Sequence, residues 1–420
     1  MNRIIRYQLG LLAGVTIVTA CASSPDTSTS VSPASGSTTL TLDARSDSAA
    51  FVTRLGADTL AVERFVVWPD RVQAEVALRT PRTSLTHYRM TLGPEKVMSL
   101  LEATDVNPRS GARSERLALN RDGDSLRITT WRAGAQSAQV GQLTEKNSRA
   151  VAADARTLPF IDMVHWPYEL ALMRVRAGGS TGLTQPLLTG ARVAPFEIAT
   201  IGTDSMTIAH PTRGTMRVRV DAQGRLLSLD AGQTTRALVV ERRPWSAVDP
   251  AEVASGWSAL DAAGRSFGDL SGRGRDTVSV RGASIVVDYG RPVKRGREIW
   301  GSLVKYDAVW RTGANLATHF TTDRNLVLDP GGTRLALPAG TYTLFSIPRA
   351  DGGTLIVSSQ TGQGGTGYDT SRDFGRVPLR VRALAEAAEL FTISVTPGGT
   401  GGELRLQWDR RELVVPFEVR

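Results

Sequence analysis

The chain has 420 residues, of which 41% are hydrophobic and 22% charged, and its formal net charge is +9. This composition is typical of a globular protein with about two or three domains. Almost all of the positive charge comes from arginines that are interleaved with acidic residues, and no basic run marks an element that would read a nucleic-acid groove. Nucleic acid is therefore not an expected partner.

The first residues have the pattern of an export signal. Arg3 and Arg6 precede an apolar run at residues 9–18, which is too short for a comfortable membrane span. The run ends in Val18-Thr19-Ala20-Cys21, which resembles the bacterial lipobox. We therefore expect residues 1–21 to form a lipoprotein signal peptide that ends at a lipidated Cys21.

Cys21 is the only cysteine of the chain. A free thiol would be a liability in an oxidising compartment, whereas a diacylated, palmitate-bearing cysteine anchors a protein firmly to a bilayer. The alternative is an ordinary secretory signal in which Cys21 falls by chance. Ala22 follows the cysteine, which favours the outer membrane, facing the periplasm, if the host has two membranes.

Residues 22–39 form a polar Ser/Thr/Pro tether that cannot build a core. Residues 40–248 then alternate between apolar and polar positions with a period of two, as at Val72, Ala74 and Val76. This pattern predicts an antiparallel sheet with one buried face. The expected fold is therefore mainly β, with an N-terminal antiparallel sheet that, in one interpretation, curls like a half-barrel around a helix.

Two helices interrupt the strands. Apolar residues at helical spacing predict one helix near 158–177, kinked or restarted at Pro167. Asp249 as N-cap and Pro250 at the first position predict a second helix, which a glycine-rich linker follows to about residue 276. We place the domain boundary in this segment, at 249–276.

Residues 277–420 return to short apolar alternations separated by Gly or Pro clusters, which are typical of a β-sandwich or jelly-roll-like domain. Several motifs occur in this stretch: residues 287–292 (VDYGRP), 294–297 (KRGR), 309–315 (VWRTGAN), 337–342 (LPAGTY) and 404–408 (LRLQW). Together they resemble a bacterial family known as domain-of-unknown-function family 2911. The resemblance implies an exported β domain and no assigned activity.

Sequence motifs of common enzymes and cofactor sites are missing. The four histidines are scattered and none has a partner at metal-ligand spacing, so no metal site is expected. A GxGxxG pattern at residues 362–367 leads into Tyr368 and not into a clear helix, so it is interpreted as a hairpin loop and not a dinucleotide site. No cofactor is expected, and catalytic residues stay unknown.

The best candidate site is a polar and aromatic cluster of the C-terminal domain. Arginine forks bind carboxylates, sulfates or phosphates, and aromatic faces stack on sugars or cations. The candidate ligand-binding residues are Tyr289, Arg291, Arg297, Trp310, Arg311, Asn315, His319, Asp369 and Asp373. Asp369 and Asp373 could pair with these arginines. Three interpretations stay open: a structural network, a binding pocket, or a catalytic site with His319 as general base.

The sequence favours a non-enzymatic, membrane-anchored envelope lipoprotein that binds a small anionic or glycan ligand or another envelope protein. One alternative is a hydrolase acting on an anionic or glycan substrate through the Arg/Asn/His cluster. A further alternative is a carrier that holds a hydrophobic molecule in the N-terminal sheet.

Overall fold

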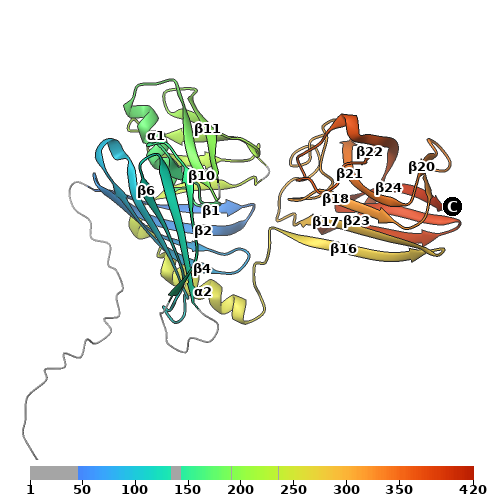
Figure 1. Ribbon diagram of the computed structural model, residues 1–420, viewed down its shortest axis with the longest axis horizontal. Coiled ribbons are helices and arrows are strands. Elements are labelled where there is room, and N and C mark those ends of the chain that lie inside the picture. Colours follow the sequence, from blue (N-terminus) through green and yellow to red (C-terminus); the bar gives the residue numbers. More distant parts are fainter. Residues whose placement is uncertain (1–45, 134–142, 191, 235) are drawn as a thin grey trace, which may run out of the picture. The chain divides into compact units, whose positions relative to one another are not determined.

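The computed structural model describes residues 46–133, 143–190, 192–234 and 236–420. Within these ranges the chain is mainly β, with two sheets and two α-helices, and this confirms the predicted fold class (Figure 1). The expected signal peptide, lipidated Cys21 and tether lie outside the described residues. No helix in these ranges is both long and apolar enough to cross a bilayer.

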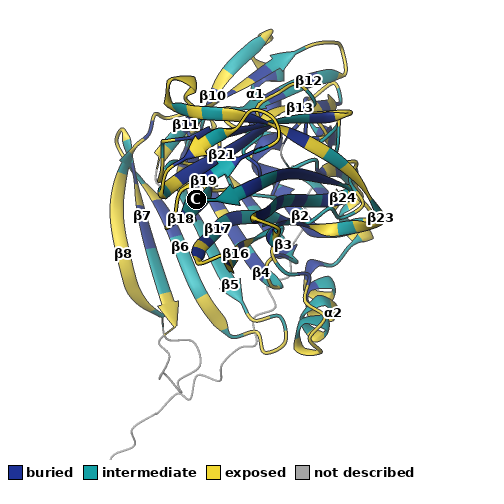
Figure 2. Cartoon of the chain, turned by 90° about the vertical axis from the view of Figure 1, so that its right-hand side faces the viewer, coloured by how far each residue is buried: buried dark blue, intermediate teal, exposed yellow. Residues whose placement is uncertain are grey.

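The N-terminal lobe is built on a 15-stranded sheet in the order β8-β7-β6-β5-β4-β3-β2-β1-β15-β14-β13-β12-β11-β10-β9. Its strands are β1 (Asp47–Leu55), β2 (Asp58–Val67), β3 (Arg71–Leu78), β4 (Ser84–Leu92), β5 (Met98–Val106), β6 (Arg113–Asp122), β7 (Ser125–Ala133), β8 (Leu143–Ala152), β9 (Leu158–Pro159), β10 (Gly182–Thr189), β11 (Arg192–Thr200), β12 (Ser205–His210), β13 (Gly214–Val220), β14 (Leu226–Asp230) and β15 (Val239–Arg243). The first and last strands pair at the centre of the sheet. The edge strand β8 is exposed along nearly all of its length (Figure 2).

The two helices lie against opposite faces of this sheet. Val72, Ala74 and Val76 are buried in the core that also contains α1 (Trp166–Ala177), as the alternation predicts. Ala77 and Leu85 point to the other face, where they pack with α2 (Pro250–Ala262). One face of the sheet is therefore occupied by α1 and part of the other by α2.

Helix α2 begins as predicted, because the Asp249 side chain accepts hydrogen bonds from the backbone N–H groups of Ala251 and Glu252. The predicted linker is shorter than expected. Strand β16 starts at Ser271, so residues 271–275 belong to the second sheet and not to a linker. Their glycines and arginines lack a strong strand signal, but pairing with β17 fixes them as an edge strand.

Helix α1 begins at Trp166, later than the predicted start near residue 158. Leu158 and Pro159 form the short strand β9, which pairs in parallel with Leu187 and Leu188 of β10. Pro167 lies in the first helical turn, where its missing N–H costs nothing. The proline therefore starts this helix and does not kink it.

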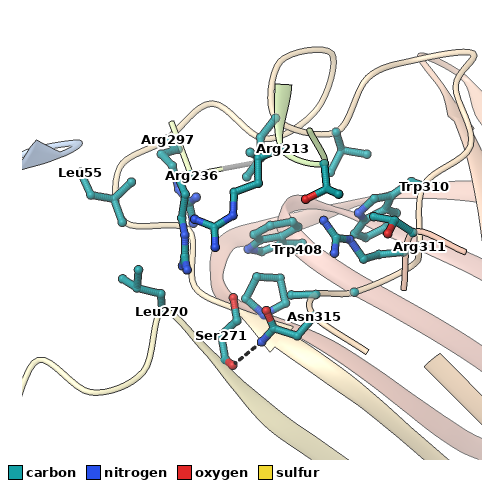
Figure 3. Close-up of a pocket in the computed structure, with 17 residues that line it drawn as sticks. Leu55, Arg213, Arg236, Leu270, Ser271, Arg297, Trp310, Arg311, Asn315 and Trp408 are labelled. Carbon is teal, nitrogen blue, oxygen red and sulfur yellow. Dashed lines mark hydrogen bonds between the residues drawn. The ribbon is translucent and has the colours of Figure 1, made fainter. Parts of the chain in front are cut away.

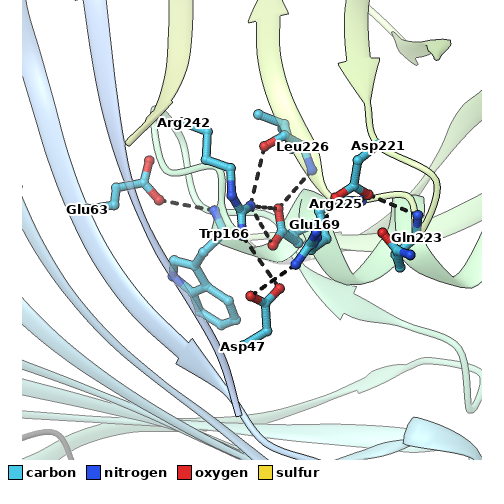
Figure 4. A network of polar contacts seen from close by, with 9 residues as sticks. All are labelled: Asp47, Glu63, Trp166, Glu169, Asp221, Gln223, Arg225, Leu226 and Arg242. Carbon is cyan, nitrogen blue, oxygen red and sulfur yellow. Dashed lines mark hydrogen bonds and ion pairs between the residues drawn. The ribbon is translucent and has the colours of Figure 1, made fainter. Parts of the chain in front are cut away.

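A buried carboxylate from strand β2 holds the N-terminus of α1. Glu63 is fully buried, and its two oxygens accept hydrogen bonds from the backbone N–H group of His165 at 2.9 Å. One of them also accepts from the Trp166 N–H at 3.0 Å (Figure 4). His165 Nδ1 lies 3.1 Å from the same carboxylate. Free N–H groups at a helix N-terminus favour an anion, so this contact satisfies both the helix and the buried charge.

A second buried carboxylate fixes α1 to the opposite arm of the sheet. Glu169 accepts hydrogen bonds from Arg242 Nη1 of β15 (2.8 Å) and from the Leu226 N–H of β14 (2.9 Å). Asp47 lies 3.5 Å from both Arg242 and Arg225, which extends the network shown in Figure 4. The helix is thus bound by charge to strands on both sides of the β1–β15 seam.

The C-terminal lobe is a 9-stranded sheet in the order β16-β17-β18-β21-β22-β23-β24-β19-β20. Its strands are β16 (Ser271–Val280), β17 (Ala283–Pro292), β18 (Thr318–Thr322), β19 (Leu326–Leu328), β20 (Leu335–Leu337), β21 (Gly340–Arg349), β22 (Gly352–Ser358), β23 (Asp373–Gly398) and β24 (Gly401–Val419). The pairing of β23 with β24 shifts register between Ala383 and Thr392, and beyond that irregularity β23 contacts β16 and β17. The sheet therefore folds over on itself in a sandwich-like arrangement around one apolar core.

We expect Glu63→Gln to lower the free energy of unfolding by about 2 kcal/mol, because an amide would turn one N–H donor toward the N–H groups of α1. Urea denaturation followed by circular dichroism would measure the change. Glu145→Gln is the matched control, since Glu145 is exposed on β8. Equal stabilities of the two variants would contradict an anchoring role for Glu63.

Candidate functional site

The segment between residues 309 and 316 is irregular in backbone and firmly tied to strand β21. Trp310 exchanges two backbone hydrogen bonds with Ser346, at 2.7 and 2.9 Å. The Thr312 hydroxyl donates to Ser346 Oγ at 2.9 Å, and the Thr318 hydroxyl donates to the Thr312 carbonyl at 2.7 Å. The segment is thus fixed by its own hydrogen bonds and is not a free loop.

Two residues of this segment adopt a left-handed backbone conformation. Thr312 has φ +52° and Asn315 has φ +61°. Asparagine tolerates this region, whereas a β-branched threonine adopts it only at a cost of about 1–3 kcal/mol. The surrounding hydrogen bonds offset that cost, and the resulting turn presents Arg311 and Asn315 from the same short segment.

A close backbone approach sets the position of the turn. A Cβ atom on Gly290 would lie 1.7 Å from the Ala314 carbonyl oxygen, so only glycine fits at this position of β17. The glycine of the VDYGRP motif therefore makes room for the VWRTGAN motif. The two motifs are parts of one local structure.

The glycine-rich loop at residues 362–367 supports the same turn. The Gly365 N–H donates to the Asn315 carbonyl at 3.0 Å, and a Cβ atom on Gly365 would lie 2.7 Å from Arg311 Cδ. Only the short 3-10 turn η3 (Thr370–Arg372) follows, which agrees with the predicted hairpin-type loop. The glycines let this loop lie directly against Arg311.

Arg311 is a half-buried cation without a counter-ion. No hydrogen bond or ion pair is formed by its side chain with any residue in the ranges that the structure describes. Burial alone lowers the pKa of the Arg311 guanidinium below its ordinary value, and no carboxylate opposes that effect. Its positive charge is therefore uncompensated within the described chain.

Arg297 has a similar environment. Its Nε donates to the Lys294 carbonyl at 2.9 Å, and its Nη2 donates to the Val293 carbonyl. Burial lowers the pKa of Arg297 to about 10, an effect that Glu389 only partly opposes. Backbone carbonyls thus orient this guanidinium without neutralising it.

Arg297 and Arg311 line a pocket with Trp310, Asn315 and Trp408 (Figure 3). Arg213 and Arg236, which Figure 3 also labels, belong to the N-terminal lobe and both pair with Asp162. We therefore define the site by Arg297, Trp310, Arg311, Asn315 and Trp408, which all belong to the C-terminal lobe. We call this set the arginine–tryptophan pocket.

Aromatic rings form the apolar part of the pocket. Trp310 stacks on Trp408 with ring centroids 6.2 Å apart and an interplanar angle of 16°. Trp300 and Phe391 meet Trp310 edge-on, at 5.9 and 5.1 Å. The Trp408 Nε1 atom is buried and has no hydrogen-bond partner in the described part of the chain, which leaves one donor of the pocket unsatisfied.

Asn315 supplies the other polar side chain. Its Nδ2 donates to the Ser271 carbonyl at 3.2 Å, as Figure 3 shows. This bond sets the orientation of the amide and leaves Oδ1 as a free acceptor among the described residues. The pocket therefore combines cationic donors, a neutral donor and an acceptor.

The sequence of this lobe has a recognisable family pattern. Residues 273–417 match the sequence model of a family described as "Protein of unknown function (DUF2911)". The C-terminal lobe is thus a DUF2911 domain. This confirms the resemblance seen in the sequence, and the pocket residues defined above all lie within the matched stretch.

Other comparisons add little to this assignment. No curated protein sequence matches the chain. A solved structure with partial likeness is that of a DUF1089 family protein from Pseudomonas aeruginosa, at 10% identity and a TM-score of 0.28. The match covers 41% of this chain and 90% of that protein.

The DUF2911 domain brings together four of the predicted site residues: Arg297, Trp310, Arg311 and Asn315. The other five have partners elsewhere. Arg291 donates to the Phe391 carbonyl (3.3 Å) and to Thr392 Oγ1 (3.0 Å). Tyr289 is buried against Phe391, and burial raises its pKa.

His319 supports the glycine-rich loop. Its Nε2 accepts a hydrogen bond from the Gly362 N–H at 3.1 Å. It lies on β18 between Asp288 of β17 and Thr343 of β21, and it does not line the pocket. His319 therefore helps to position the glycine-rich loop against the sheet.

The expected pairing of Asp369 and Asp373 with the arginines of the cluster is wrong. Asp369 accepts from the N–H and hydroxyl of Ser371 as the cap of η3, at 3.0 and 2.7 Å. Asp373 accepts from Tyr368 (2.9 Å) and from Arg376 (2.7 Å). Both carboxylates bind local partners instead, because a neighbour a few residues away costs less chain entropy than a distant one. Asp373 Oδ1 is buried without a partner in the described part of the chain.

Trp408 is the pocket residue that the sequence analysis did not assign to the site. It belongs to the motif at residues 404–408, which was read only as a family marker. Strand β24 carries it into the pocket by pairing with β23, a long-range contact that periodicity alone does not reveal. Among the described residues, no group of three or more His, Cys, Asp or Glu side chains could hold a metal ion.

We expect Gly290→Ala to displace the turn that carries Arg311 and to lower the free energy of unfolding by about 3 kcal/mol. The tryptophan emission spectrum should shift as well, since Trp310 directly precedes the turn. Urea denaturation and fluorescence would measure both effects. Gly331→Ala is the control, because no atom lies within 4 Å of a Cβ built there; equal behaviour of the two variants would count against the close approach.

Proposed function

We propose that this chain is an exported, lipid-anchored envelope protein whose DUF2911 domain binds a small anionic ligand in the arginine–tryptophan pocket. The observation that carries the binding proposal is the half-buried, uncompensated guanidinium of Arg311. The lipobox-like residues Val18–Cys21 and the single cysteine support the anchoring proposal.

The physical reason is the free energy of an unpaired charge. Partly burying a cation without giving it a partner is unfavourable, because the half-buried guanidinium of Arg311 loses part of its contact with water. Here the turn that holds Arg311 is itself strained at Thr312. Backbone strain and an unpaired cation both lower the stability of the unliganded fold. A bound anion would offset the cost of the unpaired charge.

Binding accounts for this geometry better than hydrolysis does. The candidate general base, His319, has its Nε2 occupied by the Gly362 N–H and lies outside the pocket lining. A base must reach the proton that it removes. The hydrolase alternative therefore has no positioned base among the predicted residues, and a bound anion needs only the donors that are present.

The carrier alternative concerns the N-terminal lobe and stays a prediction. Helix α1 already packs its buried side chains, including Ala171 and Leu172, into the core on one face of the sheet. A hydrophobic cargo would have to share or replace that packing. Lipid recovered with the purified protein by mass spectrometry would favour this alternative.

We expect the protein extracted from its native membranes to begin at Cys21 and to carry the mass of the attached acyl chains. Cys21→Ser should remove the lipid mass, because the diacylglyceryl group is attached through the cysteine sulfur. Intact-mass spectrometry of both proteins is the measurement. Wild-type protein with an unmodified residue 21 would refute the anchor.

We expect acetate, sulfate or inorganic phosphate to change the tryptophan fluorescence of the wild-type protein with a saturable dependence on concentration. Arg311→Met should weaken binding by about tenfold or more, as expected for the loss of a charge-assisted contact. Its free energy of unfolding should stay unchanged or rise, because the variant removes an unpaired charge.

The control is Arg372→Met, since Arg372 is exposed in the same domain and lies outside the pocket lining. This variant should bind the anions as the wild type does. The proposal fails if no anion alters the fluorescence, or if Arg311→Met binds as tightly as the wild type. A large loss of stability in Arg311→Met would instead assign Arg311 a structural role.

A further inference from the structure

We infer that the ligand of the arginine–tryptophan pocket is a carboxylated sugar ring of the uronate class. This inference rests on the proposed anion-binding function and specifies the ligand further. It follows from three features that a bare anion would leave unused: an aromatic surface, a neutral donor and an acceptor.

The guanidinium groups of Arg311 and Arg297 are the reason for assigning a carboxylate to the ligand. The planar guanidinium of Arg311 presents several N–H groups in a fixed fork that matches the two oxygens of a carboxylate. Arg297 Nη1 has no partner in the described part of the chain, because the two bonds of this side chain come from Nε and Nη2. The pocket thus has directional N–H donors as well as positive charge.

The acceptor distinguishes a hydroxylated ligand from an inorganic anion. Asn315 Oδ1 faces no donor among the described residues, and its amide is held in place through the Nδ2 bond to the Ser271 carbonyl. An unpartnered amide oxygen receives no hydrogen bond from sulfate or acetate, whereas it accepts one from a hydroxyl group. The unpartnered Trp408 Nε1 is a neutral donor that a hydroxyl or ring oxygen can satisfy.

The aromatic surface distinguishes a ring from a short carboxylic acid. Trp310 is half-buried in the pocket, while contacts with Trp300, Trp408 and Phe391 hold its indole plane. A pyranose has an apolar face of C–H bonds that packs on such a plane and hydroxyl groups at its edge. A fatty acid would use the arginine and the indole, but it would leave the buried Trp408 Nε1 without a partner and would make no hydrogen bond with the exposed side chain of Asn315.

The experiment compares methyl β-D-glucuronoside, methyl β-D-glucoside, acetate, inorganic phosphate and sulfate by isothermal titration with the mature protein. We expect the glucuronoside to bind about tenfold or more tightly than both acetate and the glucoside, since it combines the contacts of each. Arg311→Met should reduce glucuronoside affinity to about that of the glucoside.

Asn315→Gly tests the acceptor separately. Glycine tolerates the left-handed backbone of residue 315 (φ +61°), so the variant removes the amide without straining the turn. Its affinity for the glucuronoside should fall about five- to tenfold, as expected for the loss of one hydrogen bond, while its affinity for acetate should stay unchanged. Unchanged glucuronoside binding by this variant would overturn the assigned role of Asn315 and with it the sugar class.

The remaining outcomes separate this inference from the proposed function. If acetate, phosphate or sulfate binds as tightly as the glucuronoside in an Arg311-dependent manner, the pocket binds anions and the sugar assignment is wrong. If the glucoside binds as tightly as the glucuronoside and Arg311→Met has no effect, the carboxylate assignment is wrong. If none of the five probes binds, the proposed function and the ligand class fail together.

Discussion

The site depends on one backbone contact that leaves no room for a side chain. Gly290 of β17 lies against the Ala314 carbonyl, and this contact fixes where the turn after Trp310 can run. The hydrogen bonds between the turn and Ser346 then hold Thr312 in an unfavourable conformation. Arg311 and Asn315 point into one pocket as a consequence of this packing, so the glycine is a structural requirement of the site.

Buried carboxylates are hydrogen-bonded in both lobes, including Asp329 and Glu412 of the C-terminal lobe, and the half-buried cations of the pocket differ from them. In the N-terminal lobe the buried carboxylates of Glu63 and Glu169 are fully hydrogen-bonded, and they join α1 to strands on both sides of the sheet. In the C-terminal lobe Arg297 has only carbonyl partners and Arg311 has none among the described residues. Satisfied charges stabilise a fold, whereas unsatisfied ones are typical of binding sites, where stability and function compete.

The sequence predicted the features that depend on local pattern. Alternation placed Val72 and Val76 on the buried face, and Asp249 marked the start of α2 because an N-cap needs only neighbours along the chain. The start of α1 was predicted too early, since Leu158 is apolar in either a helix or a strand. Its pairing with Leu187 is decided by distant residues, which periodicity does not report.

The site residues also divide into those that local sequence predicts and those that distant contacts bring in. Arg311 and Asn315 were predicted together because one turn carries both, while Trp408 reaches the pocket through the pairing of β24 and was missed. The expected pairing of Asp369 and Asp373 with the arginines was wrong, since both carboxylates bind neighbours that are close in sequence. A pocket residue in this domain is therefore better recognised by a polar group left without a partner than by its nearness in sequence to other polar groups: Arg311 and Trp408 Nε1 meet that criterion, and Asp369 does not.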